Sequence, residues 1–341
     1  MKEGLPLVTT ALHSYPCCFP CEPPSWTDRT AAICYRVAMR QQPLGRTGFS
    51  ASVLGIGDLA DRSIPLSTCV ATLRRALDYG LNLLDTAPMY EEGYSEEIVG
   101  AALKGRRDGV FLIDKIDELD EPVAPQVDAS LQRLGLEEVD LFAFHAVNDL
   151  PAWGRIESGA MEELARCRQA GKVRFRGVSS HSPEVLRAAV TSGLCDVVMF
   201  PVGPFVDRRY VEETLPLARA HGVGAISFKT FGAGKLLGDT TGYNAPLRVR
   251  PRGKFGSGGT SPSPAEEPEL PRLGVAECLH YTLTLGPDVV LLGLSYPNEQ
   301  DEAFRAFERF QPLAPGQMRE IERRATEAIE GKGPCWWNPP A

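Results

Sequence analysis

The sequence contains no apolar stretch that approaches the roughly 20 residues of a membrane-spanning helix. It also lacks a surplus of positive charge, since 36 Lys and Arg stand against 44 Asp and Glu, a net charge of -8. No basic start leads into the apolar stretch, roughly 7–15 residues long, of a secretory signal. We therefore expect neither a membrane protein nor a nucleic-acid binder, which needs a basic face.

Clustered cysteines are scarce outside the first 38 residues. Five of the nine cysteines stand singly, namely Cys69, Cys167, Cys195, Cys278 and Cys335. Scattered cysteines are typical of reduced core thiols in a cytoplasmic protein, and we predict that location. Of the remaining four, only Cys18 and Cys21 have the spacing of a zinc-binding pair. We predict no metal site.

Residues 1–38 show no helical or strand periodicity and contain several prolines. We interpret them as a disordered N-terminal extension of a folded domain that covers residues 39–312. The alternative is a metal clip made by the cysteines of this segment, Cys17, Cys18, Cys21 and Cys34.

Apolar runs and helical patterns alternate from residue 50 onward. The predicted strands are 50–57, 81–86, 110–116, 140–145, 173–180, 196–202, 225–229 and 289–294. The predicted helices that follow them are 67–79, 95–103, 124–134, 159–169, 183–191, 211–220, 275–285 and 299–310. Most of the strands are continuously apolar, as in parallel sheets buried on both faces.

Eight strand–helix units in sequence predict an α/β fold of the (β/α)8 TIM-barrel type. The alternative is a doubly wound open sheet, which usually carries a G-x-G-x-x-G turn after its first strand. Residues 55–60 match that motif only partly. Two segments lie outside the alternation: an insert rich in Pro, Gly and Ser at 238–272, and a C-terminal helix and tail at 313–341.

Three polar residues end consecutive predicted strands: Asp85, Lys115 and His145. Tyr90 follows in the loop after the first of these strands. Because neighbouring barrel strands lie about 4.8 Å apart, the four side chains can converge at the C-terminal end of the barrel, where such folds place their active sites. Each residue alone has an ordinary structural explanation, but the set is hard to explain by packing.

This set suits carbonyl reduction. An alkoxide formed at a carbonyl must be protonated, and a tyrosine hydroxyl with an ordinary pKa of about 10 is a poor acid. An adjacent ammonium lowers that pKa by favouring the phenolate. We expect Lys115 to have this effect, Asp85 to hold Lys115, and His145 to hydrogen-bond the carbonyl oxygen.

The motifs resemble those of the aldo-keto reductases over a stretch from Pro43 to about Phe310. They are Asp85-Thr86-Ala87-Pro88-Met89-Tyr90, Lys115, Asp140-Leu141-Phe142-Ala143-Phe144-His145 and Gly177-Val178-Ser179-Ser180-His181. The resemblance implies a (β/α)8 fold, an NAD(P)H cofactor and the catalytic tetrad Asp85, Tyr90, Lys115 and His145, with Tyr90 as the acid/base. Tyr94 is the rival tyrosine, but Tyr90 has the spacing of the family.

The same resemblance implies where the cofactor binds. Gly57 and Asp58 would lie near the nicotinamide, Ser179 and Ser180 would hold its carboxamide, and Met199 replaces a common Gln. A turn would wrap the pyrophosphate, with Phe228, Lys229, Thr230, Gly232, Gly234, Lys235 and Leu236. Gly293, Ser295 and Gln300 follow the last strand, at the adenosine end.

The adenosine end departs from members that favour NADPH. Where these carry a basic residue, Ser and Arg, this sequence has Leu294, Ser295 and Gln300, followed by two acidic residues. We predict NADP(H), with NAD(H) as the alternative. Basic residues of the insert are candidates for the missing charge, or form a solvated loop: Arg248, Arg250, Arg252 and Lys254.

Three functions remain open. The first is NAD(P)H-dependent reduction of an aldehyde or ketone, or the reverse. The second is a cofactor-binding regulatory or partner subunit with little turnover. The third is an isomerase or lyase that uses Lys115 as a Schiff-base amine. The expected partner is a small carbonyl substrate, and the sequence does not predict its identity or the oligomeric state.

Overall fold

The computed structural model describes residues 39–57, 62–238 and 271–339. The chain divides into two units, Met1–Val37 and Ala38–Ala341. The predicted N-terminal extension with its cysteines, Asp58, and the basic residues of the insert lie outside the described residues.

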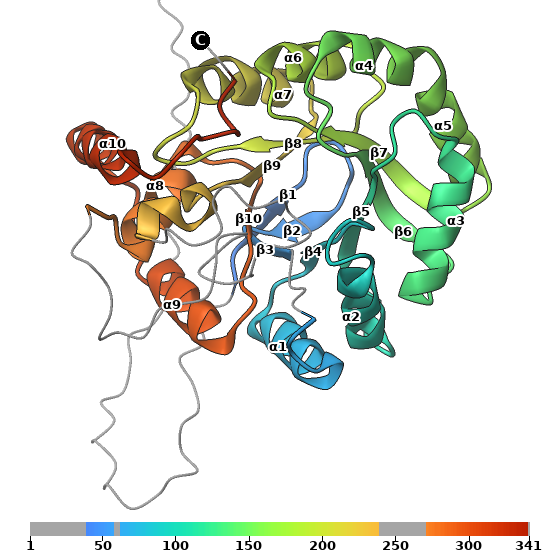
Figure 1. Ribbon diagram of the computed structural model, residues 1–341, viewed down its shortest axis with the longest axis horizontal. Helices are drawn as coiled ribbons and strands as arrows, with labels where there is room; N and C mark the ends of the chain where they lie inside the picture. Colours follow the sequence, from blue (N-terminus) through green and yellow to red (C-terminus); the bar gives the residue numbers. More distant parts are fainter. Residues whose placement is uncertain (1–38, 58–61, 239–270, 340–341) are drawn as a thin grey trace, which may run out of the picture. The chain divides into compact units, whose positions relative to one another are not determined.

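The described part of the second unit is built on a closed barrel of parallel strands, which confirms the predicted (β/α)8 fold (Figure 1). The strands are β3 (Leu54–Gly57), β4 (Leu83–Asp85), β5 (Phe111–Ile116), β6 (Val139–Phe144), β7 (Val173–Ser179), β8 (Val197–Pro201), β9 (Gly224–Phe228) and β10 (Val289–Leu292). They follow one another around the barrel in sequence order, and β10 closes it against β3.

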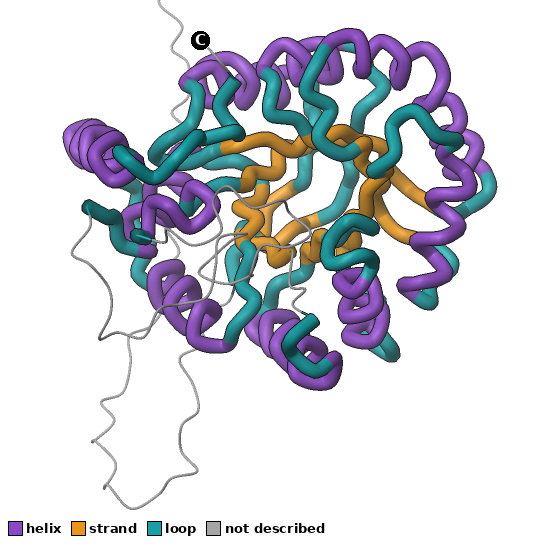
Figure 2. The backbone as a smooth tube through the Cα atoms, in the orientation of Figure 1, coloured by secondary structure: helices purple, strands orange, loops and turns teal. Residues whose placement is uncertain are grey.

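A ring of helices surrounds the barrel (Figure 2). The helices are α1 (Leu66–Tyr79), α2 (Tyr94–Leu103), α3 (Val123–Leu134), α4 (Leu150–Arg155), α5 (Met161–Gln169), α6 (Pro183–Thr191), α7 (Leu215–Ala220), α8 (Val275–Leu285), α9 (Pro297–Glu308) and α10 (Pro315–Ile329). The bounds of α6 and α8 are those predicted. For α6 the reason is local, because the Ser182 hydroxyl accepts a hydrogen bond from Val185 N–H (3.3 Å) and Pro183 opens the helix.

Three predicted elements differ from the structure in more than their end residues. One is the predicted helix 211–220, which consists of a π-helical turn at Tyr210–Thr214 followed by α7. The predicted strand 50–57 is divided at Val53 into β2 (Ser50–Ser52) and β3. β2 pairs antiparallel with β1 (Gln41–Pro43), outside the barrel. The predicted helix 159–169 begins earlier, because α4 and a π-helical turn at Ile156–Ala160 run directly into α5.

The hairpin β1–β2 packs against the N-terminal end of the barrel. Leu44 and Ala51, from the hairpin, are fully buried in the inner core together with strand residues such as Phe111 and Val197. Arg46 N–H donates to the Gly222 carbonyl (2.7 Å), just before β9 begins. The hairpin therefore fills the barrel interior at its N-terminal end, whereas the polar residues that end the strands lie at the C-terminal end.

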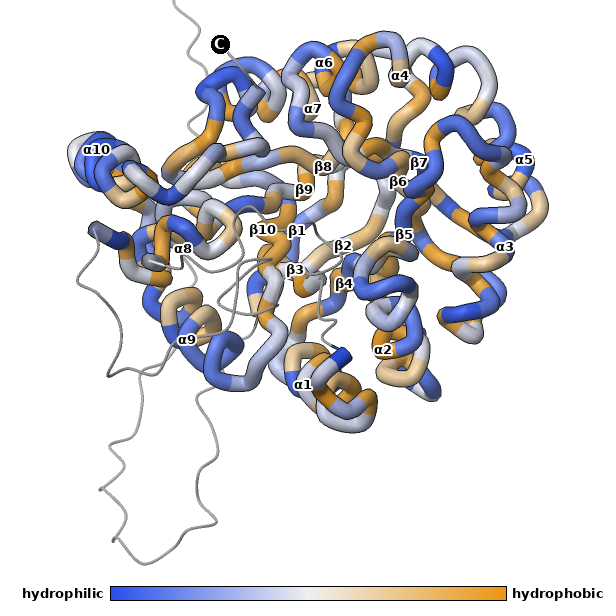
Figure 3. Tube along the Cα trace, viewed as in Figure 1, coloured by the Kyte–Doolittle hydropathy of each residue, from blue (hydrophilic) through white to orange (hydrophobic). Residues whose placement is uncertain are grey.

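A second, larger core fills the space between strands and helices. Along the helices in Figure 3, hydrophilic and hydrophobic residues alternate, as expected for helices with one face on a barrel. None of the helices among the described residues combines the length and the hydropathy needed to cross a bilayer.

The segment after α10 returns to the C-terminal end of the barrel. Trp337 is fully buried, and its indole N–H donates to the Phe205 carbonyl (2.9 Å). Asn338 accepts a hydrogen bond from Asp207 N–H (2.8 Å). Lys332 donates to the Lys235 carbonyl (2.9 Å). These contacts fix the segment 331–339, which we call the C-terminal strap, over the ends of β8 and β9.

Candidate active site

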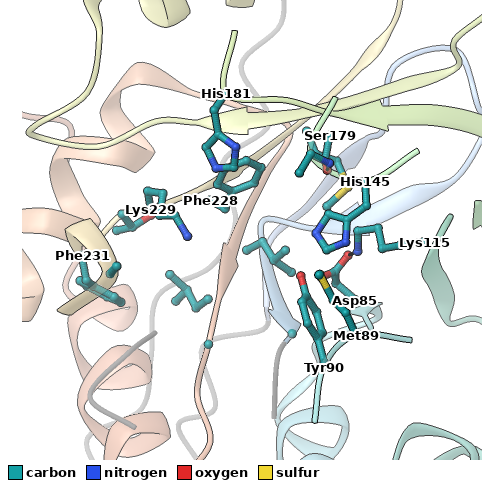
Figure 4. A pocket seen from close by; sticks show the side chains of 18 of the residues that line it. Asp85, Met89, Tyr90, Lys115, His145, Ser179, His181, Phe228, Lys229 and Phe231 are labelled. Carbon is teal, nitrogen blue, oxygen red and sulfur yellow. Dashed lines mark hydrogen bonds and ion pairs between the residues drawn. The ribbon is translucent and has the colours of Figure 1, made fainter. Parts of the chain in front are cut away.

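A cavity of about 290 Å³ opens at the C-terminal end of the barrel. Its lining comes from the ends of β3 to β10 and from the C-terminal strap. The polar or aromatic lining residues are Asp85, Tyr90, Lys115, His145, Ser179, His181, Phe228, Lys229, Thr230, Phe231 and Trp336. Figure 4 shows two groups of side chains facing each other across it: Asp85, Tyr90, Lys115 and His145 on one side, and His181, Phe228, Lys229 and Phe231 on the other.

Asp85 and Lys115 form a buried ion pair on adjacent strands. Their side chains are 3% and 2% exposed, and Lys115 Nζ donates to Asp85 Oδ1 and to the Thr86 carbonyl (2.9 Å). Such a pair is tolerated in the interior because each charge has a partner of opposite sign. Gly57 leaves the room for it, since a Cβ at this position would lie 2.9 Å from Asp85 Cβ.

Tyr90 lies against this pair. Its ring centroid is 5.8 Å from Lys115 Nζ and 5.7 Å from the His145 ring, which it meets edge-on. The rival Tyr94 is the first residue of α2 and is not in the cavity lining, and its hydroxyl donates to the Ile64 carbonyl (2.9 Å). The structure thus brings Tyr90, and not Tyr94, together with the other three predicted residues.

Asp117 completes this side of the site, and the sequence prediction missed it. Its Oδ1 is hydrogen-bonded to His145 Nδ1, and its Oδ2 accepts a hydrogen bond from Met89 N–H (2.7 Å). Burial acts to raise the pKa of Asp117, but the hydrogen bond and charge of His145 and the bond from Met89 outweigh it, so the pKa lies below its ordinary value. Strand periodicity gave no direct signal for it, because Asp117 lies one residue beyond both the predicted strand 110–116 and β5.

The backbone around the cavity is strained. Ala146, Lys229 and Ala233 line the cavity with φ of 53°, 69° and 53°, and Glu91 and Glu92, next to Tyr90, have φ of 51° and 55°. Positive φ is uncommon for residues other than glycine, and such residues cluster at functional sites. The strain therefore supports this end of the barrel as the working site.

The opposite wall is aromatic with one cation. His181 lies 5.3 Å from Phe228 and 5.2 Å from Trp336, ring centroid to ring centroid. Lys229 Nζ lies 4.3 Å from the Trp336 ring centroid. Burial, then the charges of Lys229 and His145, lower the pKa of His181 to about 3, so His181 is neutral at physiological pH. Trp336 was not predicted, because only the folded strap brings it here.

The predicted cofactor-binding residues fall into two sets. Those that line the cavity are Gly57, Ser179, Met199, Phe228, Lys229, Thr230 and Gly293. Those described but outside its lining are Ser180, Gly232, Gly234, Lys235, Leu236, Ser295 and Gln300.

Several residues of the second set have structural contacts. Ser180 Oγ donates to the Val147 carbonyl (2.5 Å). Lys235 is 1% exposed and donates to the Pro334 carbonyl of the strap (2.6 Å). Gln300 is fully buried and donates to the Thr72 carbonyl (2.9 Å), while Arg75 donates to Gln300 and pairs with Asp301. These contacts hold the loops and α9 in place around the cavity.

No group of three or more His, Cys, Asp or Glu side chains suited to a metal ion occurs in residues 39–57, 62–238 and 271–339. Cys69, Cys167, Cys195 and Cys278 are buried free thiols, and Cys335 is partly buried.

The fold and the cavity define a (β/α)8 barrel protein with Tyr90, His145 and the Asp85–Lys115 ion pair gathered in one cavity at the C-terminal ends of its strands. The model of the aldo/keto reductase family matches residues 53–324, and the chain belongs to that family.

Curated relatives carry related descriptions. The aldo-keto reductase YhdN of Bacillus subtilis is 32% identical over 221 residues, 60% of this chain and 65% of the relative. The NADH-specific methylglyoxal reductase of Escherichia coli is 28% identical over 241 residues, 62% of this chain and 73% of the relative. The chain spans 64% of the length of another relative, an uncharacterized oxidoreductase YqkF of Bacillus subtilis.

Solved structures share the fold. The holo form of the aldo-keto reductase AKR11C1 from Bacillus halodurans has a TM-score of 0.64 at 24% identity, over 84% of this chain and 96% of the other. An aldo-keto reductase from Klebsiella pneumoniae, in complex with NADPH, has a TM-score of 0.59 at 20% identity, over 80% and 91% of the two chains.

Proposed function

We propose that this protein reduces an aldehyde or ketone to an alcohol, or catalyses the reverse reaction, with a nicotinamide cofactor. The observation that carries the proposal is the convergence of Tyr90, His145 and the Asp85–Lys115 ion pair on one side of a single cavity. These are the groups that a developing alkoxide needs, namely an acid, a hydrogen-bond donor and a fixed positive charge.

The cavity contains polar atoms that a bound cofactor could satisfy. Two buried polar atoms of its lining residues, Thr230 Oγ1 and His181 Nε2, have no hydrogen-bond partner among the described residues. Buried polar atoms are normally satisfied, so these two are candidates to bind a ligand. When bound, the reduced nicotinamide supplies the hydride. The cavity residues Gly57, Ser179, Met199, Phe228, Lys229, Thr230 and Gly293 are those we propose to hold the cofactor.

Lys115, Tyr90 and His145 have separate roles in the proposed proton transfer. Lys115 keeps its charge because Asp85 and the Thr86 carbonyl bind its ammonium group. That positive charge favours the phenolate of Tyr90, so the hydroxyl gives its proton to the substrate oxygen more readily. His145 donates a hydrogen bond to the same oxygen and fixes its position between the two groups.

We propose NADP(H) as the cofactor and NAD(H) as the alternative. A structural neighbour is solved with NADPH, whereas the Escherichia coli relative is named as NADH-specific. At the edge of α9, Arg75 is paired with Asp301. A 2′-phosphate would therefore draw its positive charge from elsewhere, and the arginines of the insert are our candidates. We also propose a cytoplasmic location, which the buried free thiols support.

The ion pair argues against the lyase alternative. A Schiff base needs a neutral amine, and Lys115 is held as an ammonium by a buried carboxylate. The regulatory alternative is an outcome of the test below, in which the cofactor binds and no carbonyl turns over.

Oxidation of NADPH and of NADH with a panel of aldehydes and ketones tests the function. We expect turnover that falls by about 10³-fold or more in Tyr90→Phe, because the variant has no proton to give. Tyr94→Phe is the matched control, since Tyr94 donates to a backbone carbonyl outside the cavity lining. Equal losses in the two variants, or full activity in Tyr90→Phe, would refute the role of Tyr90.

A further inference from the structure

Two buried lysines join the C-terminal strap to the turn that follows β9. Lys235, in that turn, donates to the carbonyl of Pro334 in the strap (2.6 Å). Lys332, in the strap, donates back to the carbonyl of Lys235 (2.9 Å) and to that of Pro271 (2.9 Å), a few residues before α8. The two lysines are 1% and 5% exposed. We call this reciprocal pair, Lys235 and Lys332, the clasp.

The burial of the clasp makes it a firm link. A lysine ammonium is normally left in water, because its burial is costly without hydrogen-bond partners. Here backbone carbonyls replace the water, and Lys332 uses two of its three N–H donors on them. Any separation of the strap from the turn would leave a buried charge without these partners.

The turn held by the clasp has a strained backbone. It spans Gly232–Leu237, in which Ala233 has φ of 53° and Gly234 has φ of 88°. A residue other than glycine keeps such a conformation only where its surroundings impose it. The strap is part of those surroundings, because a Cβ on Gly232 would lie 3.5 Å from the ring of Trp337, an ordinary van der Waals contact.

The same segment carries residues that we propose to hold the cofactor. Residues 228–230 line the cavity and directly precede the turn, and Ala233 of the turn lines it as well. The strap contacts this segment a second time, since Lys229 Nζ lies 4.3 Å from the ring centroid of Trp336. Segment 228–237 therefore contributes to the cavity and is held by the strap at two places.

We propose that Lys332 is a positioning residue for the cofactor, which holds segment 228–237 through the clasp in the conformation that binds a nicotinamide nucleotide. Lys332 is outside the cavity lining, so it acts through the turn. This inference rests on the proposed nicotinamide-dependent reduction. It also changes the role of Lys235, from the pyrophosphate ligand that the family resemblance implies to one half of the clasp.

Calorimetric titration of the full chain with NADPH, and with NADH, tests the proposal. Lys332→Met keeps a long side chain and removes the ammonium. We expect the Kd for the nucleotide to rise by about 10-fold or more, since hydrogen bonds from a charged donor are lost. The kcat at saturating nucleotide should stay close to that of the parent, because the tetrad is untouched. A purely structural role would lower the stability of Lys332→Met and leave the Kd unchanged, which would overturn the inference.

Two further variants sharpen the test. Lys172→Met is the matched control, because Lys172 pairs with Asp128 at the surface, and we expect no change in Kd. Lys235→Met separates the clasp from direct contact with the cofactor. If the two lysines act together, the double variant should bind the nucleotide no more weakly than the weaker single variant. Weakened binding in Lys235→Met beside parental binding in Lys332→Met would overturn the inference and leave Lys235 as a direct ligand.

A measurement on the parent protein needs no variant to fold. Because the clasp joins the two segments, saturating NADPH should slow amide hydrogen exchange in the strap, 331–339, as well as in the turn. Lys332→Met, where it folds, should lose this protection in the strap. Unchanged exchange of the strap in the parent, with the nucleotide bound, would overturn the inference.

The inference and the proposed function can fail separately. If the parent binds a nucleotide and reduces no carbonyl, the proposed reduction fails, while the Kd and exchange data still decide the role of Lys332. If the parent binds neither NADPH nor NADH, both fail.

Discussion

Two neighbouring residues of β5 face opposite sides of the barrel wall and differ in their electrostatics. Lys115 points into the cavity, where it is paired with Asp85. Asp114 is fully buried behind the wall, near Glu96 and Arg133 of the helix layer. Both positions are inaccessible to water, so burial alone does not distinguish them.

Their partners do. Asp114 Oδ1 accepts Lys115 N–H (2.8 Å), and the Asp114 carboxyl also faces the carboxyl of Glu96. Burial first, and then the charge of Glu96, raise the pKa of Asp114 well above its ordinary value. Asp117, which follows β5 and is hydrogen-bonded to His145 and Met89, has a lowered pKa instead. Asp114 and Asp117, three residues apart, thus have pKa values shifted in opposite directions, one beside another acid and the other beside hydrogen-bond donors.

The largest effect should come from breaking the cavity pair. Lys115→Met should abolish turnover and lower the free energy of unfolding by about 3–5 kcal/mol, because Asp85 is left buried without its cation. Urea unfolding and carbonyl reduction measure the two effects. Lys115→Met with Asp85→Asn should regain most of the stability and none of the activity. Recovery of activity in that double variant would contradict the role of the pair.

The two tryptophans of the C-terminal strap also differ, because one is buried and the other lines the cavity. Trp337→Ala should cost about 3–5 kcal/mol of unfolding free energy, since the ring is fully buried. Trp336→Ala should cost far less, because this side chain is 39% exposed and lines the cavity, and should instead change KM for substrates. Thermal unfolding and Michaelis kinetics of both variants test this. Equal stability losses would show that the two rings have the same role.

The smallest effect should appear at Asp114. A raised folded-state pKa means that its contribution to stability is full below the unfolded pKa of about 3.9 and is lost as the pH rises through the folded pKa. Asp114→Asn has no carboxyl group to ionise. Its free energy of unfolding should therefore increasingly exceed that of the parent as the pH rises, by about 1–3 kcal/mol at most. Urea unfolding between acid and alkaline pH measures it. Asp120→Asn is the control, because the Asp120 side chain is 76% exposed and its replacement should not change the pH dependence of stability. A variant less stable than the parent at neutral pH would mean that Asp114 is ionised.

The sequence was most informative where strand periodicity decides the geometry. Asp85, Lys115 and His145 end consecutive strands of a parallel barrel, and parallel pairing brings strand ends to one rim. Asp117 lies one residue beyond the end of β5, so this rule did not identify it. Lys235 and Gln300 were assigned from their sequence positions, but contacts with the strap and with α1 determine where their side chains lie. Trp336 had no local signal, because its place depends on long-range contacts such as Trp337 with Phe205.

The C-terminal strap is also synthesised later than the barrel strands. A chain leaves the ribosome from its N-terminus onward, so all strands from β3 to β10 are synthesised before Trp336 and Trp337. The strands can therefore be complete before the strap that contributes Trp336 to the cavity lining. The hydrogen bond from Trp337 to the Phe205 carbonyl then holds the strap in place, and with it the part of the cavity lining that Trp336 provides.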